Sequence, residues 1–187
     1  MAEPLAEEPA FDAVVFLDVD GVCHPATTVG GDYTDEAALF AAEAMQHLAA
    51  IVASQSPPAS VVLTSTWRKH DVLRARVDAA LKRHGILRGV EGATDVLPRA
   101  DAASSRQAEI CHWLRNHSVR RFVILDDLPL ASHATTSGLW GYGAYASVHA
   151  HCICPDYQLG LEEQHVAVAQ TILTHNVWSD EILVDSE

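Results

Sequence analysis

Polar residues suited to catalysis follow three apolar segments of this 187-residue chain. They are Asp18 and Asp20, Thr64 and Ser65, and Asp126 and Asp127. Carboxylates serve as nucleophiles, proton carriers and ligands of hard cations, while hydroxyls bind anionic oxygens. The first acidic pair has few basic residues near it to neutralise it, which indicates a bound cation. Mg²⁺ fits this set, because it takes oxygen ligands and usually keeps positions open for phosphate and water.

The first acidic pair ends the stretch that organises the chain. Residues 13–17 form a continuous apolar run that reaches Asp18, which is typical of a strand buried on both faces of a parallel sheet. Gly21 then lets the backbone turn sharply. Ligands of open α/β sheets bind beyond the carboxyl ends of the strands, where Asp18 and Asp20 are expected. Taken alone, the pattern also fits an acidic turn after a strand, because Asp and Gly are common in turns.

The elements that must position these residues alternate between strands and helices. The predicted strands are 13–18, 60–63, 90–94, 122–125 and 147–153. The predicted helices are 35–54, with Thr34 as N-cap and Ala38, Leu39, Ala42, Met45 and Leu48 as its apolar face, then 71–84, 106–117 and 160–173. This alternation predicts an α/β fold with a mainly parallel, five-stranded sheet. The three polar pairs then meet at one edge of it.

The rest of the chain predicts a single domain of about 12–175, between an acidic lead-in, 1–11, and an acidic tail, 176–187. The N-terminus lacks the basic and apolar regions of a signal peptide, and no segment is long and apolar enough for a transmembrane helix. The cysteines do not form a spaced disulfide framework. We therefore expect reduced thiols and a cytoplasmic, intracellular location without membrane partners.

The formal net charge of −13 is the clearest signal in the composition. The chain has two lysines, Lys69 and Lys82, and its other cations are arginines. Such a surface repels nucleic-acid phosphates and anionic membranes at long range. This weighs moderately against nucleic acid as a partner, since a local arginine patch can still bind a particular substrate.

The order of the polar groups resembles the haloacid dehalogenase-like (HAD) superfamily of phosphohydrolases. Motif one is Asp18-Val19-Asp20-Gly21-Val22, motif two is Thr64 at the end of VVLT, and motif four is ILDD, with Asp126 and Asp127. The resemblance covers about residues 13–174 and implies a three-layer, Rossmann-like sandwich. Motif three is normally a lysine, but no lysine follows Lys82, so Arg106 is the candidate. Arginine supplies the same charge with a different hydrogen-bond geometry.

The family mechanism assigns a role to each residue. The resemblance implies that Asp18 attacks phosphorus to give an aspartyl-phosphate, and that Asp20 protonates the leaving oxygen and then activates water. Thr64, Ser65 and Arg106 would bind the phosphoryl oxygens. Mg²⁺ would be held by the Asp18 carboxylate, the Asp20 backbone carbonyl and Asp126, with Asp127 supporting the metal shell. The second acid, Asp20, argues against the dehalogenases of the superfamily, which do not carry it.

Secondary motifs look like a smaller subgroup, the HAD domain of multidomain RNA repair proteins. They are LTSTWR, R-x-x-EI-x-x-WL and a late helix that begins with GL. The spacing between motifs leaves no room for a separate cap domain, and an open site suits a large substrate such as a phosphoprotein or a nucleic-acid end. Trp67 and Arg68 are candidates for a substrate wall, although a core tryptophan beside a surface arginine is an equally good interpretation.

Other interpretations remain open at this point. A small-metabolite or nucleotide phosphatase, a phosphotransferase, or a non-catalytic phosphate-binding domain would share the fold. A receiver domain is disfavoured, because it carries its acid pair before the phosphorylated aspartate and its lysine last. The cluster HAHCIC, with His149, His151, Cys152 and Cys154, contains zinc-type ligands, but an edge strand with buried cysteines is the better prediction. His24 follows motif one and is interpreted as a loop residue close to the site.

Overall fold

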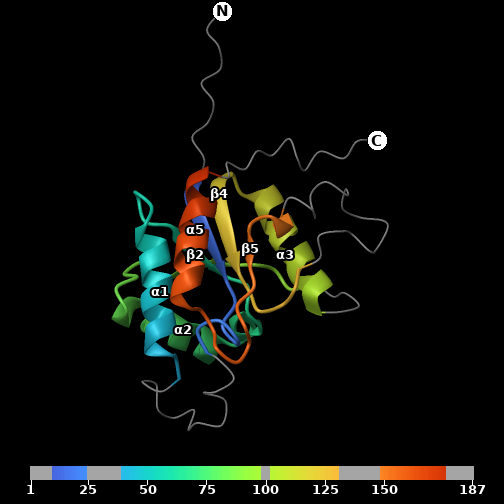
Figure 1. Cartoon of the computed structure of the whole chain (residues 1–187). Coiled ribbons are helices and arrows are strands. Elements are labelled where there is room, and N and C mark those ends of the chain that lie inside the picture. Colours follow the sequence, from blue (N-terminus) through green and yellow to red (C-terminus); the bar gives the residue numbers. More distant parts are fainter. Residues whose placement is uncertain (1–9, 25–38, 98–101, 131–147, 176–187) are drawn as a thin grey trace, which may run out of the picture.

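The computed structural model describes residues 10–24, 39–97, 102–130 and 148–175 (Figure 1). Strands and helices alternate through most of this part of the chain. The strands are β1 (Phe11–Leu17), β2 (Ser60–Leu63), β3 (Val90–Ala93), β4 (Val119–Leu125) and β5 (Cys152–Ile153). The helices are α1 (Ala42–Ala53), α2 (Asp71–Arg83), α3 (Ala102–Asn116) and α5 (Glu163–His175), with a short 3₁₀ turn η2 (Thr66–Lys69) after β2.

The five strands form one sheet in the order β3-β2-β1-β4-β5, and every neighbouring pair is parallel. β1 is the central strand, as expected from its continuous apolar sequence. Parallel neighbours need crossover connections, which the helices provide. The predicted α/β fold with a mainly parallel, five-stranded sheet is confirmed.

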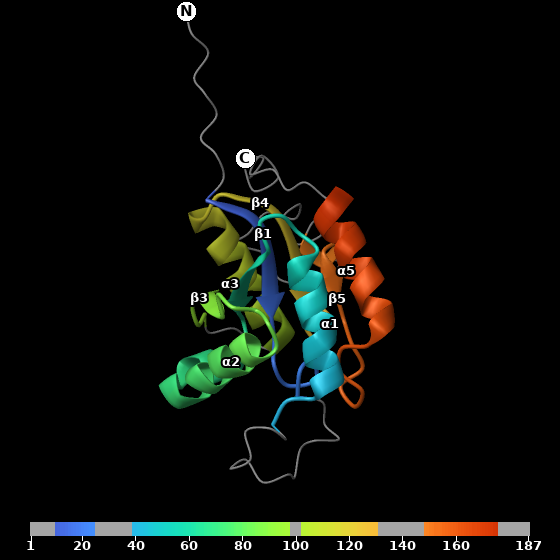
Figure 2. The ribbon, with the colours of Figure 1, turned by 90° about the vertical axis from the view of Figure 1, so that its left-hand side faces the viewer.

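Alternate side chains of the central strands enter two separate apolar clusters. On β1, Val15 and Leu17 belong to a cluster with side chains of α1, α2 and α5, whereas Val14 and Phe16 belong to a cluster with side chains of α3. α1 and α5 lie together on one side of the sheet and α3 on the other (Figures 1 and 2). The chain therefore has the three-layer, Rossmann-like arrangement, and both faces of β1 are buried.

Several element boundaries differ from the predictions. α1 begins at Ala42 rather than at residue 35; Leu39 is buried in a bend before the helix, and Ala42 is exposed on it. The proposed cap Thr34 and the face residue Ala38 lie outside the described residues. α3 begins four residues earlier than expected, at Ala102, because small residues extend the helix from its apolar part toward its N-terminus.

The predicted strand 147–153 is the largest correction. β5 consists of two residues, and a short helical turn at Val148 and His149 precedes it. The His151 ring is buried, and its Nδ1 donates a hydrogen bond to the Phe122 carbonyl oxygen, 2.9 Å away. This contact anchors the turn to β4. The first part of the predicted strand is therefore a turn packed against the sheet rather than an extended segment.

In the residues that the structure describes, no helix is long and apolar enough to cross a membrane. The expectation that the site has no cap depends partly on segments 25–38 and 131–147, and the predicted lead-in and tail depend on 1–9 and 176–187. These segments lie outside the described residues.

Candidate active site

The carboxyl ends of β1, β2 and β4 lie at one level, because Leu17 pairs in register with both Leu63 and Leu125. The first residue after each strand continues the hydrogen-bond ladder. The Asp18 N–H donates to the Leu125 carbonyl at 2.9 Å, and the Thr64 N–H donates to the Leu17 carbonyl at 2.8 Å. The sheet thus brings together side chains that lie far apart in the sequence.

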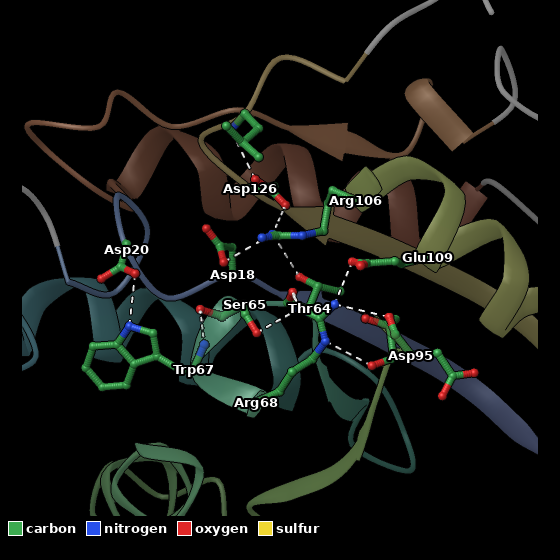
Figure 3. A network of polar contacts seen from close by, with 12 residues as sticks. Asp18, Asp20, Thr64, Ser65, Trp67, Arg68, Asp95, Arg106, Glu109 and Asp126 are labelled. Atoms are coloured by element: carbon green, nitrogen blue, oxygen red, sulfur yellow. Dashed lines mark hydrogen bonds and ion pairs between the residues drawn. The ribbon is translucent and has the colours of Figure 1, made fainter. Parts of the chain in front are cut away.

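Arg106 joins these strand ends from α3 (Figure 3). Its Nη1 lies 3.1 Å from Asp18 Oδ1, donates to Thr64 Oγ1 at 3.3 Å, and forms a close ion pair with Asp126. All four residues are buried. One guanidinium nitrogen therefore contacts the residues predicted as nucleophile, phosphate ligand and metal ligand.

Asp127 completes a group of carboxylates. Asp18, Asp126 and Asp127 each present a carboxylate oxygen within 4.8 Å of the others, which is a spacing that one cation can bridge. Asp126 is fixed from its other oxygen, which accepts a hydrogen bond from the Leu128 N–H at 3.0 Å. The sequence prediction gave Asp127 a supporting role, whereas its geometry makes it as good a candidate ligand as Asp126.

Gly21, in the turn after β1, lies close to the Asp127 side chain. Its φ of +74° is rarely adopted by other residues, and a Cβ there would lie 2.7 Å from both the Asp127 carboxyl carbon and the Tyr157 ring. A side chain at residue 21 would therefore displace Asp127.

The negative charge of the group shifts the pKa values of its members. Burial raises the pKa of Asp126 to about 7; nearby Asp18 adds to the shift, and Arg106 opposes it. Burial also raises the pKa of Asp127 to about 6, with Asp18 contributing through its charge and a hydrogen bond. For Arg106, burial alone would lower the pKa, but the carboxylates of Asp18, Asp126 and Glu109 outweigh it and raise it. Three carboxylates share one guanidinium, and the excess negative charge favours a cation or bound protons.

The Asp20 side chain lies outside this group. Its Oδ2 accepts a hydrogen bond from Trp67 Nε1 at 2.9 Å, and its Oδ1 lies 3.4 Å from His24 Nδ1. In Figure 3 the Asp20 carboxylate turns toward the Trp67 indole rather than toward Arg106. The structure brings five of the other predicted side chains together at the strand ends, namely Asp18, Thr64, Arg106, Asp126 and Asp127. It gives the Asp20 carboxylate separate neighbours.

The burial of Trp67 and Arg68 contradicts their interpretation as a substrate wall. Trp67 is 6% exposed in the apolar core, and the Arg68 side chain is 4% exposed. Neither side chain presents a face on which a base could stack. Ser65 also differs from its predicted role, because its hydroxyl oxygen accepts a hydrogen bond from the Trp67 N–H at 3.3 Å and so caps the η2 turn.

Arg68 forms a buried network with Glu109, which the sequence prediction missed. Arg68 Nη2 lies 2.6 Å from Glu109 Oε2, and the same guanidinium donates to the carbonyl oxygens of Thr64, Ser65, Thr94 and Asp95. The other Glu109 oxygen accepts a hydrogen bond from the Leu97 N–H at 3.0 Å. Glu109 falls on the same helical stripe as Arg106 and Trp113, and that spacing was the signal available in the sequence.

The HAHCIC cluster does not assemble as a metal site. His149 and Cys154 are exposed, His151 is buried against Phe122, and Cys154 Sγ donates to the Asp127 carbonyl oxygen at 3.1 Å. Within the described ranges, one set of three residues with metal-binding side chains lies close enough to hold an ion, and it consists of Asp18, Asp126 and Asp127. The prediction of an edge strand fits β5, although Cys152 is half-buried rather than fully buried.

Comparison with known proteins gives one match. A family model described as the HAD domain in Swiss Army Knife RNA repair proteins matches residues 14–166. No curated protein and no solved structure matches the chain. The matched range contains every residue of the site described above.

Proposed function

Because the chain belongs to the family of the HAD domain in Swiss Army Knife RNA repair proteins, we propose that it is a magnesium-dependent phosphomonoester hydrolase that works through an aspartyl-phosphate. The family indicates a phosphatase-type hydrolase. The contact of Arg106 Nη1 with both Asp18 Oδ1 and Thr64 Oγ1 carries the finer proposal. It supports a phosphoryl group bound beside a carboxylate nucleophile.

The donor set supports Mg²⁺ as the cation. Asp18, Asp126 and Asp127 offer hard carboxylate oxygens, which Mg²⁺ prefers, and the excess negative charge among them favours a divalent ion. These side chains, with the Asp20 backbone carbonyl, would hold the ion. When bound, Mg²⁺ would offset the repulsion between an anionic nucleophile and an anionic phosphate.

The reaction has two displacements, the formation and the hydrolysis of the aspartyl-phosphate, and each side chain has a role in them. Asp18 attacks phosphorus, and the electron pair of the breaking P–O bond leaves with the ester oxygen, to which Asp20 delivers a proton. Asp20 next removes a proton from the water that attacks the aspartyl-phosphate, releasing inorganic phosphate and the Asp18 carboxylate. Thr64 and Arg106 hold the phosphoryl oxygens, where charge rests in the transition state.

We propose a phosphorylated nucleic-acid end as the substrate, in keeping with the RNA repair proteins that give the family its name. The net charge of −13 opposes tight binding to a polyanion, so contact would be limited to the terminal phosphate. Activity should then depend little on strand length or salt. Strong preference for a nucleotide or a sugar phosphate would favour the alternative of a small-metabolite phosphatase.

The proposal is tested with p-nitrophenyl phosphate and Mg²⁺, comparing Asp18→Asn with Asp12→Asn. These two aspartates stand at opposite ends of β1, so the second variant is a matched control. We expect Asp18→Asn to abolish turnover and Asp12→Asn to leave it unchanged. Acid quenching during turnover, followed by mass spectrometry of the peptides, should find phosphate on Asp18. Full activity of Asp18→Asn, or activity in excess chelator, would contradict the mechanism.

A further inference from the structure

Two buried rings hold the carboxylate of Asp20 while it remains accessible to solvent. The Asp20 side chain is 42% exposed, although Trp67 and His24, which lie against its two oxygens, are buried. The Trp67 contact is a well-formed hydrogen bond of 2.9 Å, and the His24 contact is longer, at 3.4 Å. The carboxylate is thus fixed from the protein side and open on the other side.

Trp67 is itself a fixed donor. Its ring packs against Phe40 and, edge to face, against His24, with ring centroids 5.8 Å away in each case. Its backbone N–H is bound by the Ser65 hydroxyl oxygen, and its carbonyl oxygen accepts from the His70 N–H at 3.1 Å. An indole has a single donor, Nε1–H, which needs a partner when it is buried. That donor is directed at Asp20.

The partner is informative, because a carbonyl oxygen would satisfy a buried indole equally well. Trp67 instead binds the carboxylate two residues beyond Asp18, although the two residues lie 47 positions apart in the sequence. Trp67 also follows Thr64 by one short turn, and Thr64 contacts Arg106. The segment 64–67 therefore links the Asp20 carboxylate to the phosphate-binding side chains.

We propose that Trp67 is a positioning residue for proton transfer by Asp20, an inference that rests on the proposed phosphatase function. The indole N–H occupies Oδ2 as an acceptor, so the transferable proton belongs on Oδ1. In the first displacement this proton passes from Oδ1 to the ester oxygen as that oxygen receives the electron pair of the P–O bond. In the second, Oδ1 takes a proton from the attacking water. Trp67 exchanges no proton and keeps the carboxyl group oriented in both steps.

The test compares two substrates of similar size that differ in their need for a proton. p-Nitrophenolate leaves phosphorus without protonation, whereas the more basic phenolate of phenyl phosphate requires it. Trp67→Phe keeps an aromatic ring and removes the N–H. We expect it to lower kcat/KM on phenyl phosphate about 10- to 100-fold, and on p-nitrophenyl phosphate by no more than about 3-fold, since general acid catalysis contributes about 10²–10⁴. The ratio kcat/KM is the readout because it reports the first displacement alone, whereas the second displacement is common to both substrates and enters kcat.

Matched variants separate positioning from packing. Trp113→Phe changes another buried tryptophan, one that stacks on His117 on the α3 side of the sheet, and should leave the ratio of the two rates unchanged. In kcat/KM, Asp20→Asn should show a selective loss on phenyl phosphate at least as large as that of Trp67→Phe, and adding Trp67→Phe to Asp20→Asn should cause no further loss. Equal losses of kcat/KM on both substrates, or no loss on either, would overturn the proposal.

A second measurement is independent of activity and of how well Trp67→Phe folds. In ¹H–¹⁵N NMR spectra, the indole N–H resonance of Trp67 should shift in Asp20→Asn, while that of Trp113 should not. An unmoved Trp67 resonance would overturn the inference. If wild-type protein with Mg²⁺ hydrolyses neither phosphate while the resonance shifts as expected, the phosphatase function fails and the contact stands.

Discussion

Two buried arginines hold the same edge of the sheet in different ways. Arg68 follows β2 and directs its guanidinium to one carboxylate, Glu109, and to four backbone carbonyl oxygens. Arg106 comes from α3 and places a single nitrogen among two carboxylates and the Thr64 hydroxyl. Both side chains are almost fully buried, so exposure does not distinguish them.

Charge balance is what distinguishes them. The Arg68–Glu109 pair is neutral and satisfied by hydrogen bonds, as expected for a group that fixes structure. Arg106, by contrast, lies among the three carboxylates of Asp18, Asp126 and Asp127. Burial and the repulsion between these carboxylates raise the pKa values of Asp126 and Asp127. Buried carboxylates whose charge is not neutralised favour the binding of a cation. At the same edge of the sheet, Arg68 therefore stabilises the structure, and Arg106 belongs to a candidate binding site.

The largest expected effect comes from removing the Arg106 side chain. Arg106→Ala should lower kcat/KM for p-nitrophenyl phosphate by about 10³-fold or more, because it removes a contact with developing phosphoryl charge. Arg106→Lys should recover part of this loss, since it keeps the charge but not the geometry. Steady-state kinetics measure both, with the exposed Arg88→Ala as control. Equal rates for Arg106→Ala and wild type would remove Arg106 from the site.

Removing the Arg68 side chain should lower the stability of the fold. Arg68→Ala leaves the buried Glu109 carboxylate without its cation, which typically costs about 3–5 kcal/mol. Urea denaturation should show this loss in the free energy of unfolding. Arg120→Ala, which breaks an exposed pair with Asp12, should cost about 1 kcal/mol or less. A similarly small loss for Arg68→Ala would show that the pair is not a scaffold.

Replacing both Arg68 and Glu109 by apolar residues separates the contribution of their ion pair from that of the hydrogen bonds that Arg68 donates. The double variant Arg68→Met/Glu109→Leu should be more stable than Arg68→Ala, because no unpaired charge remains buried. It should still fall about 1–2 kcal/mol below wild type, because the carbonyl oxygens that Arg68 binds lose their donor. Full recovery in urea denaturation would mean that those hydrogen bonds contribute little.

The smallest expected effect concerns pH and Mg²⁺. Burial raises the pKa values of Asp126 and Asp127 from 3.8 to about 7 and about 6, so the folded, metal-free protein binds more protons than the unfolded chain between these values. Its free energy of unfolding should therefore fall as pH rises from about 4 to about 7. Mg²⁺ would take the place of those protons.

Mg²⁺ should thus raise the melting temperature more at pH 8 than at pH 5, by about 2–4 °C for each kcal/mol. Thermal denaturation with and without Mg²⁺ at the two pH values measures the difference. Asp127→Asn should reduce it, and Asp12→Asn should not. A pH-independent effect of Mg²⁺ would show that the ion binds elsewhere.

The sequence predicted the sheet and the residues at its carboxyl edge because those signals are local. Apolar runs such as 13–17 and 122–125 are typical of buried strands, and the residues that follow such strands lie at the strand ends. Arg106 was found because the family pattern required a cation in that interval, and the structure places it in contact with Asp18.

Contacts between distant side chains could not be predicted in the same way. Nothing local to Asp20 indicates that its carboxylate faces Trp67, and nothing local to Arg68 indicates that it is buried against Glu109. Both depend on how η2 packs against the β1 turn and α3. The predicted strand 147–153 failed for a related reason, because His151 contacts β4 from a turn rather than from an extended segment.

The pairing of β1 with β4 has a consequence for how the protein folds during its synthesis. Residue 11 pairs with residue 119 and residue 17 with residue 125, so the central strand, which can pair with β2 earlier, lacks its second neighbour until residues 119–125 have left the ribosome. Until then one edge of the apolar strand β1 is open to pairing with other chains. Such long-range parallel pairing is slow, because the chain must close a large loop before the contacts form. Asp126 and Asp127 join Asp18 only at that step, so a nascent chain completes its candidate site late.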